Sequence, residues 1–256
     1  MSDDAPRAAL ITGAARRIGR AIALKLAGEG YALALHYRSS ETEARELAGE
    51  IAAMNVPVAL VRGDLADEEA PLKIVLDAVA RLGPLSLLVN NASLFEPDEL
   101  QTMTLAGWQA HMDVNLRAPL FLAQAFAGQK PPGAPANIIN LIDQRVMKLN
   151  PLFYSYTLSK AALWTATRTM AQALAPQGIR VNAIAPGPAL ASSRMEEEDF
   201  VRQCSLTLMG CGTSPEEIAH AVSFILSAPA MTGQMIILDG GQHLNWRTPD
   251  ITEVSE

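Results

Sequence analysis

The sequence predicts an α/β fold: a doubly wound parallel sheet of about seven strands with helices on both faces. Seven short apolar runs alternate with segments long enough for helices along the whole chain. Each run is apolar almost throughout, as expected of strands buried on both faces. The first run also leads into a glycine-containing turn, where sheets of this kind bind nucleotides.

The predicted strands are Ala8–Ile11, Ala32–Tyr37, Val58–Val61, Leu85–Val89, Asn137–Ile142, Arg180–Ala185 and Met235–Leu238. Arg20–Ala27 and Ser40–Met54 are predicted helices, and Ser40 and Glu43 have the spacing of a capping box. The turn-rich stretch Gly128–Pro135 reads as a surface loop before a strand. We expect one domain over residues 1–256, with a polar tail at about 247–256.

Composition and charge argue against several classes of protein. The chain has 256 residues and a net charge of -7, which argues against a nucleic-acid-binding protein, since such proteins need a basic surface. No apolar run approaches the ~20 residues that span a bilayer, and the acidic start is unlike a secretory signal. We therefore expect a cytoplasmic protein without a membrane partner. Cys204 and Cys211 lack a metal-site pattern, so no metal is expected.

The turn after the first strand, "ITGAARRIG", suits a phosphate. Gly13 and Gly19 flank the turn, where glycine lets the backbone approach a pyrophosphate at a helix N-terminus. Arg17 replaces the glycine of the common G-x-G pattern. It is not expected to serve as a minimal turn residue, but its forked cation can lie beside phosphates. An ordinary βα turn with a solvated arginine is the alternative.

The end of the second strand indicates which dinucleotide is preferred. Sheets that bind NAD usually carry an acidic residue here, and this strand instead offers His36, Arg38, Ser39 and Ser40. A cation and hydroxyls suit a 2′-phosphate, so NADP is favoured, unless Arg38 and Ser40 only serve the surface and the helix cap. Asp64, after the third strand, either accepts from the adenine amino group or simply begins a helix.

Five segments in order, "TGAARRIG", "LLVNNAS", "VNL", "YTLSK" and "VNAIAPG", resemble the short-chain dehydrogenase/reductase family over nearly the whole chain. The resemblance implies one Rossmann-type domain that transfers hydride with a nicotinamide cofactor. It places further cofactor contacts at Ile18, Leu65, Asn91, Ala92, Ser93, Pro186 and Gly187. It also places a substrate-covering loop at about 188–214, which we expect to be mobile, and implies a homotetramer or homodimer.

Three departures narrow the resemblance. Arg17 and Ser93 stand where most members have glycine, and Asp143 stands where most have the catalytic serine. Together with "LHYRSS" and "NNASLF", this combination resembles the pteridine reductases and dihydromonapterin reductases. That subgroup reduces dihydropterins, and in some members folate, with NADPH.

Tyr156 and Lys160 are the expected catalytic pair. A spacing of four places both on one face of a helix, and an ammonium lowers a tyrosine pKa from its usual ~10. The tyrosine can then give a proton as hydride arrives. Tyr154 has Leu158 at that spacing and is read as packing or pocket wall. The resemblance gives Asn115 a role in a proton relay; a backbone-bonded helix asparagine is the alternative.

Asp143 suggests the substrate. An ionised carboxylate cannot donate to a carbonyl oxygen, but beside Tyr156 it can join a proton relay to a ring nitrogen. In the resemblance Ser93 and Phe95 complete the pocket: Phe95 could stack on a flat pterin, and Arg17 could reach substrate heteroatoms. The competing interpretations are an aspartate that has lost function and a Phe95 that belongs to the core or an interface.

Three functions remain open at this point. The first is an NADPH-dependent dihydropterin reductase, which Asp143 favours. The second is a carbonyl or 3-oxoacyl reductase of the broader family, with Asp143 a local variation. The third is a non-catalytic module that senses the nucleotide, against which the complete set of Tyr156, Lys160 and Asn115 argues.

Overall fold

The computed structural model describes residues 7–191, 194–248 and 251. Its sheet has the strand order β3-β2-β1-β4-β5-β6-β7, and every neighbouring pair is parallel. The predicted parallel sheet is therefore confirmed. The strands are β1 (Ala8–Ile11), β2 (Ala32–Tyr37), β3 (Val58–Arg62), β4 (Leu87–Asn90), β5 (Ala136–Leu141), β6 (Ile179–Pro186) and β7 (Met235–Leu238).

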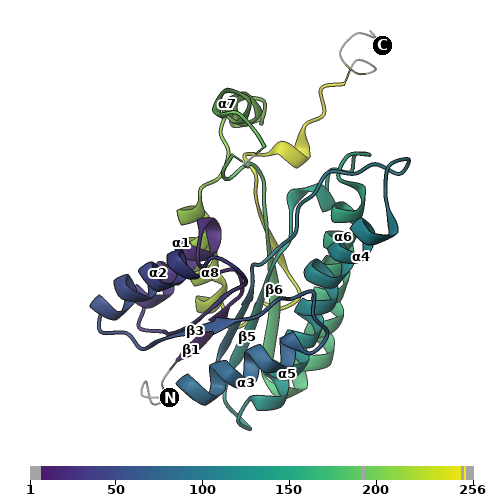
Figure 1. The fold of residues 1–256 in the computed structure, drawn as a ribbon. Coiled ribbons are helices and arrows are strands. Elements are labelled where there is room, and N and C mark those ends of the chain that lie inside the picture. The colour runs from purple at the N-terminus through teal and green to yellow at the C-terminus, as the bar shows by residue number, and fades with distance from the viewer. Residues whose placement is uncertain (1–6, 192–193, 249–250, 252–256) are drawn as a thin grey trace.

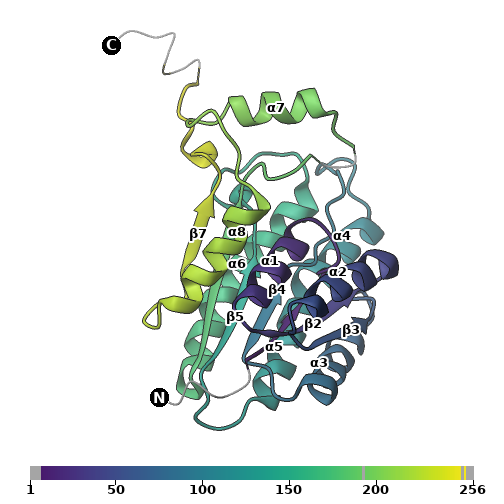
Figure 2. The ribbon, with the colours of Figure 1, turned by 90° about the vertical axis from the view of Figure 1, so that its left-hand side faces the viewer.

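Helices cover both faces of the sheet (Figure 1). One face carries α1 (Arg17–Gly28), α2 (Glu41–Ala53) and α8 (Pro215–Ser227). The other carries α3 (Ala70–Leu82), α4 (Leu105–Met112), α5 (Ala118–Gln129) and α6 (Tyr154–Leu174). A π-helical turn (Asp113–Arg117) joins α4 to α5, and short 3₁₀ turns span Gln144–Val146, Ala175–Gln177 and Gln242–Leu244. The helix α7 (Glu197–Ser205) lies apart, across the top of the molecule in Figure 2.

Alternate side chains of each strand enter opposite cores. Ile11 belongs to the same core as Ile22 of α1 on one face, and Leu10 belongs to the same core as Phe126 of α5 on the other. All four are fully buried. Burying one aliphatic side chain of this size stabilises the fold by about 1.5–3 kcal/mol, and it explains why the strands are apolar almost throughout.

The structure corrects several predicted bounds. β4 begins at Leu87, because Gln129 takes both backbone groups of Leu85: its Oε1 accepts from the Leu85 N–H at 2.9 Å and its Nε2 donates to the Leu85 carbonyl at 3.0 Å. Helix α1 begins at Arg17 rather than Arg20, so its N-terminus lies inside the glycine turn. The exposed loop predicted at 128–135 is shorter, because α5 continues to Gln129.

The predicted capping box at Ser40 is wrong. Ser40 is the N-cap of α2, but its ψ of 59° is not extended and its side chain makes no capping bond. Glu43 instead pairs with Arg16 at 3.4 Å. A capping box is present instead at α8, where Ser214 is extended and exchanges bonds with Glu217.

None of the helices in the described residues is both long and apolar enough to cross a bilayer. Most of the predicted polar tail, at about 247–256, lies outside the described residues.

Candidate active site

Two adjoining cavities open at the carboxyl ends of the strands. One, of about 390 Å³, contains Asp143, Tyr156 and Lys160 among its lining residues. The other, of about 460 Å³, extends over the ends of β2 and β3. Both are lined by Arg17, Ile18, Asn91 and Ser93, so these four residues stand where the cavities meet.

The two predicted turn glycines are needed for close packing. Gly13 has the left-handed φ of +63°. A Cβ on Gly19 would lie 2.2 Å from the Gly13 carbonyl oxygen and 2.7 Å from Nδ2 of Asn91. Asn91 Nδ2 donates to the carbonyls of Thr12 and Gly13 at 2.9 and 3.1 Å, which fixes this contact. Only glycine therefore lets α1 start this close to the strand ends.

Arg17 does serve as a turn residue, contrary to the prediction. Its φ of +55° lies in the left-handed region, the conformation that glycine adopts most easily. Its guanidinium donates to the carbonyl oxygens of Ala191 at 2.8 Å and Leu190 at 3.2 Å. The side chain thus links the first turn to the segment predicted to cover the substrate.

The second cavity gathers most of the predicted nucleotide residues: Gly13, Ile18, Gly19, Arg38, Ser39, Ser40, Asp64, Leu65, Asn91, Ala92 and Ser93. Asp64 Oδ1 accepts from the Ala66 N–H at 3.0 Å, as an ordinary turn residue does. Three arginines, Arg16, Arg17 and Arg38, line this cavity against the single carboxylate of Asp64, so it suits a polyanionic ligand.

His36 also borders this cavity, but it is not placed as predicted. The side chain is 2% exposed, and both ring nitrogens are within 3.2 Å of backbone atoms, the Gly13 nitrogen and the Gly63 carbonyl oxygen. The ring therefore has no nitrogen left to contact a phosphate directly.

Tyr156 and Asp143 meet in the first cavity. The Tyr156 hydroxyl donates to Asp143 Oδ2 at 2.9 Å, and the Arg145 backbone N–H donates to Oδ1 at 2.8 Å. Asp143 is the N-cap of the 3₁₀ turn Gln144–Val146, and Tyr156 lies in the first turn of α6. Both carboxylate oxygens thus act as acceptors. The neighbouring Tyr154 lines neither cavity.

Burial has the largest effect on the pKa values of Tyr156 and Asp143. It raises the pKa of Tyr156 well above its usual value, and the nearby Asp143 carboxylate raises it further. Burial also raises the pKa of Asp143, against the lowering effect of the bonds from Arg145 and Tyr156. The predicted lowering of the Tyr156 pKa is therefore wrong here: desolvation of the phenolate outweighs the lowering effects, which come from Arg145 and Ser93. Tyr156 consequently keeps its proton.

Lys160 is buried beside the pair. Its Nζ donates to the Leu141 carbonyl at 2.7 Å and lies 5.7 Å from the centre of the Tyr156 ring. Burial lowers the pKa of Lys160 to about 8, although Asp143 opposes this shift.

Asn115 is fully buried in the π-helical turn and joins Ser93 to α6. Its Nδ2 donates to the Leu94 carbonyl at 2.9 Å and to Ser159 Oγ at 3.1 Å. Its Oδ1 accepts from the Leu94 N–H at 2.8 Å and from Ser93 Oγ at 3.2 Å. The two bonds to Leu94 agree with the backbone-bonded alternative, the two serine contacts go beyond it, and a role in a proton relay stays a prediction.

Phe95 lines the first cavity, as predicted, but with an aromatic partner that was not foreseen. Its ring stacks on Phe153, with centroids 4.2 Å apart and planes 4° apart, and meets the Tyr156 ring edge-on at 4.6 Å. Phe153 has a left-handed φ of +56°, which the sequence gives no means of predicting. The guanidinium of Arg145 lies 4.9 Å from the centre of the Phe153 ring.

Several other lining residues were missed: Gln144, Arg145, Phe153, Arg194, Met195 and Gln203. Gln144 is notable because its buried Oε1 has no hydrogen-bond partner among the described residues. Proximity in sequence to Asp143 and Tyr156 could have suggested Gln144, Arg145 and Phe153. The others come from the loop at 188–214, for which no residue pattern was recognised.

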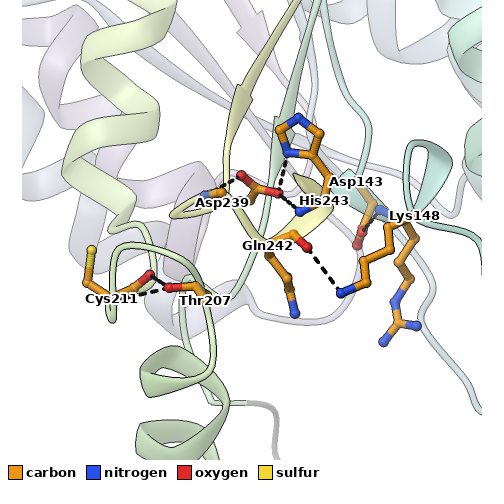
Figure 3. Close-up of polar contacts among 9 residues, drawn as sticks. Asp143, Lys148, Thr207, Cys211, Asp239, Gln242 and His243 are labelled. Atoms are coloured by element: carbon orange, nitrogen blue, oxygen red, sulfur yellow. Dashed lines mark hydrogen bonds and ion pairs between the residues drawn. The ribbon is translucent and has the colours of Figure 1, made fainter. Parts of the chain in front are cut away.

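This loop contains a helix, is anchored near its start and forms a hydrogen-bonded turn near its end. Arg194 pairs with Glu96 at 2.8 Å and also donates to the Phe95 carbonyl. At the far end, Thr207 Oγ1 accepts from the Cys211 N–H at 3.1 Å and donates to its carbonyl at 2.8 Å (Figure 3). Residues 192–193 lie outside the described part of the loop.

The turn after β7 borders the first cavity, which Gln242 lines. Asp239 Oδ2 accepts from the His243 backbone N–H at 2.7 Å and lies 2.8 Å from its Nδ1, and Lys148 donates to the Gln242 carbonyl at 3.1 Å (Figure 3). Pro186 and Gly187 line the cavity as predicted, and a Cβ on Gly187 would lie 2.5 Å from the Asp239 Cβ. Glycine is therefore required at 187.

Comparisons with known proteins cover nearly the whole chain. A family model described as enoyl-(acyl carrier protein) reductase matches residues 13–243. The 3-oxoacyl-[acyl-carrier-protein] reductase FabG of Staphylococcus aureus (strain N315) is 34% identical over 245 residues, which are 93% of this chain and 98% of that protein.

Two solved structures are more similar. FolM alternative dihydrofolate reductase 1 from Brucella canis, complexed with NADP, is 46% identical with a TM-score of 0.91, over 96% of this chain and 98% of that chain. The protein of the same description from Brucella suis, also with NADP, is 46% identical with a TM-score of 0.93, over 98% of this chain and 100% of that one.

Proposed function

Since the chain belongs to the short-chain dehydrogenase/reductase family, we propose that it reduces a dihydropterin with NADPH, Tyr156 giving the proton. It is an oxidoreductase with NADPH as its cofactor, in keeping with the NADP-bound FolM structures. The dihydropterin substrate is supported by the similarity to FolM and by the contacts of Asp143.

The residues of the second cavity fit NADPH. The turn glycines let α1 begin close to the strand ends, and the N-terminus of α1 opens on this cavity, which suits a pyrophosphate. Arg38, Ser39 and Ser40 would hold the 2′-phosphate, and Asp64 and Leu65, which line the same cavity, would contact the adenine. Lys160, Pro186 and Gly187 would hold the nicotinamide end.

Reduction of a C=N bond adds a hydride to carbon and a proton to nitrogen, while the π bond breaks. Bound NADPH supplies the hydride. Tyr156 holds its proton firmly and can release it to a nitrogen that becomes basic as the hydride arrives. The charged Lys160 stabilises the phenolate that remains, and the Asp143 carboxyl, whose pKa is raised, can exchange a proton with it.

One observation carries the choice of substrate: the Tyr156 hydroxyl donates to Asp143 Oδ2 while Oδ1 accepts from Arg145. With both oxygens acting as acceptors, Asp143 offers no donor to a substrate carbonyl oxygen. It would repel the negative charge that grows on such an oxygen. A ring nitrogen that must receive a proton suits this arrangement.

A 3-oxoacyl reductase is the second candidate, and the 34% identity to FabG favours it. The two functions separate in an assay of NADPH oxidation with dihydrobiopterin, dihydromonapterin and a 3-oxoacyl thioester. We expect turnover with a dihydropterin, and Asp143→Ser should lower it. Activity on the thioester alone, kept or improved by Asp143→Ser, would overturn the proposal.

A further inference from the structure

His36 is the last residue but one of β2 and lies buried between two loops that border the second cavity. Its ring Nδ1 accepts from the Gly13 N–H at 3.2 Å, and its Nε2 lies 3.2 Å from the Gly63 carbonyl oxygen. Gly13 belongs to the turn between β1 and α1, and Gly63 directly follows β3. One side chain therefore joins the loops on the two sides of β2.

These two contacts define the state of the ring. A backbone N–H can only donate, so Nδ1 must accept, and a carbonyl can only accept, so Nε2 must carry the hydrogen. Only the neutral Nε2–H tautomer satisfies both contacts. Burial acts in the same direction: it lowers the pKa of His36 to about 4, although the Gly63 carbonyl and the Asp64 carboxylate oppose the shift.

The backbone around His36 strengthens the same connection. The His36 carbonyl accepts from the Ala14 N–H at 2.9 Å, and the Tyr37 carbonyl accepts from the Gly63 N–H at 3.1 Å. The N–H groups of Gly13 and Ala14 are thus already used. A pyrophosphate would have to bind the free N–H groups of the first turn of α1, whose position this connection sets.

We propose that His36 is a positioning residue for the cofactor: its neutral imidazole holds the phosphate-binding turn against the adenine-side loop without touching the nucleotide. Recognition of the 2′-phosphate is left to Arg38, Ser39 and Ser40. This inference rests on the proposed use of NADPH, and it predicts how NADPH and NADH binding should change in two kinds of variant. Loss of His36 should weaken NADPH and NADH alike, because both contain the pyrophosphate and the adenosine, whereas loss of Arg38 should weaken NADPH alone.

Two substitutions test the two hydrogen bonds of the His36 ring separately. His36→Asn keeps an acceptor near the place of Nδ1 and loses the bond to Gly63, and His36→Gln keeps a donor near the place of Nε2 and loses the bond to Gly13. Dissociation constants of both nucleotides should rise about tenfold in each variant, because a buried backbone group loses its partner. Arg38→Ala is the comparison for direct phosphate contact. Leu33→Ala, also in the buried part of β2, is the control for destabilisation alone.

Each result has a defined meaning. An equal loss for NADPH and NADH, with Leu33→Ala lowering Tm but binding both normally, supports the proposal. A loss for NADPH alone would make His36 a direct contact, and unchanged binding of both would reduce it to a core residue; either overturns it. If the wild-type protein itself fails to bind NADPH, the proposed function fails instead.

A measurement on the wild-type protein keeps the proposal testable if the variants do not fold. The chain has 4 histidines, and ¹⁵N NMR distinguishes the tautomers of each ring. We expect the His36 ring to show the neutral Nε2–H form at pH 5.5, below the ordinary histidine pKa of about 6.5. A charged ring, or the Nδ1–H tautomer, would overturn the proposal.

Discussion

The Tyr156 hydroxyl donates a 2.9 Å hydrogen bond to Asp143, thirteen residues earlier in the chain; the tyrosine is buried and the aspartate is partly buried. The contact exists because β5 ends just before Asp143 and α6 begins just before Tyr156. The carboxyl end of β5 and the N-terminus of α6 therefore meet. Burial then keeps the proton on the phenol, which makes Tyr156 a proton donor.

Removal of that hydroxyl should stop turnover while leaving the fold intact. We expect Tyr156→Phe to lower kcat for the dihydropterin by about 10²- to 10⁴-fold, the usual contribution of a general acid. Tyr154→Phe is the matched control, since Tyr154 lines neither cavity and should leave kcat close to wild type. Rapid single-turnover oxidation of NADPH would measure the step directly. Comparable losses in both variants would assign the effect to packing.

The pH dependence of kcat should report Lys160. Its pKa is lowered to about 8, so the ammonium that stabilises the phenolate is present below that pH and lost as pH rises through it. Tyr156 stays protonated over this range, because its pKa is raised well above its usual value. We therefore expect kcat to fall above pH 8. Asp143→Asn removes the carboxylate that raises the Lys160 pKa, so it should move this decline to lower pH; a rate that is constant to pH 10 would contradict the assignment.

Gly19 should tolerate no side chain. A Cβ there would lie 2.2 Å from the Gly13 carbonyl oxygen, so Gly19→Ala must displace the start of α1 and should abolish NADPH binding in a fluorescence titration. A Cβ on Gly28, at the other end of α1, would meet no atom within 4 Å. Gly28→Ala should bind NADPH normally and stabilise the helix by roughly 0.5–1 kcal/mol. Normal binding by Gly19→Ala would show that the turn can relax.

A buried polar chain behind the site should contribute to stability. Asn90 Nδ2 donates to Asn140 Oδ1, and Asn140 Nδ2 donates to Thr167 Oγ1, both at 2.9 Å. Thr167→Val leaves the Asn140 amide unpaired and should lower the free energy of unfolding in urea by about 1–3 kcal/mol. Thr169→Val removes a similar hydroxyl from the exposed side of α6 and should change it by less than about 0.5 kcal/mol. Equal losses of unfolding free energy in the two variants would indicate that the buried hydrogen bonds rearrange around position 167.

Much of the fold could be predicted because its signals are local. The apolar runs mark the strands: β1, β2 and β7 have the predicted bounds, and β3, β4, β5 and β6 differ by one or two residues. The differences arise where distant groups intervene, as when Gln129 takes the backbone bonds of Leu85. The capping box at Ser40 failed for a similar reason, since Glu43 turns to Arg16.

In the candidate site, too, some residues could be predicted from local patterns and others could not. Spacing and order pointed to Tyr156, Lys160 and the glycine turn, because each is a short pattern that chemistry requires, and the family resemblance pointed to Asp143. The direction of the Tyr156 pKa could not be predicted, since it depends on burial by residues from separate elements. Phe153 and Arg194 were missed because they enter the cavity through an unusual backbone angle and through a loop without a recognisable pattern.

By itself, then, the sequence determined a parallel sheet with a nucleotide turn, a tyrosine–lysine pair and a carboxylate in place of a serine. The first two follow from periodicity, spacing and residue type, which are properties of neighbours along the chain, and the third follows from the resemblance to the family. Only the tertiary structure decided that Asp143 accepts from Tyr156, that Arg17 links the turn to the loop, and that His36 faces backbone rather than phosphate. Those outcomes depend on which groups remain unpaired after folding, because a buried polar group binds whichever partner the packed chain brings within reach.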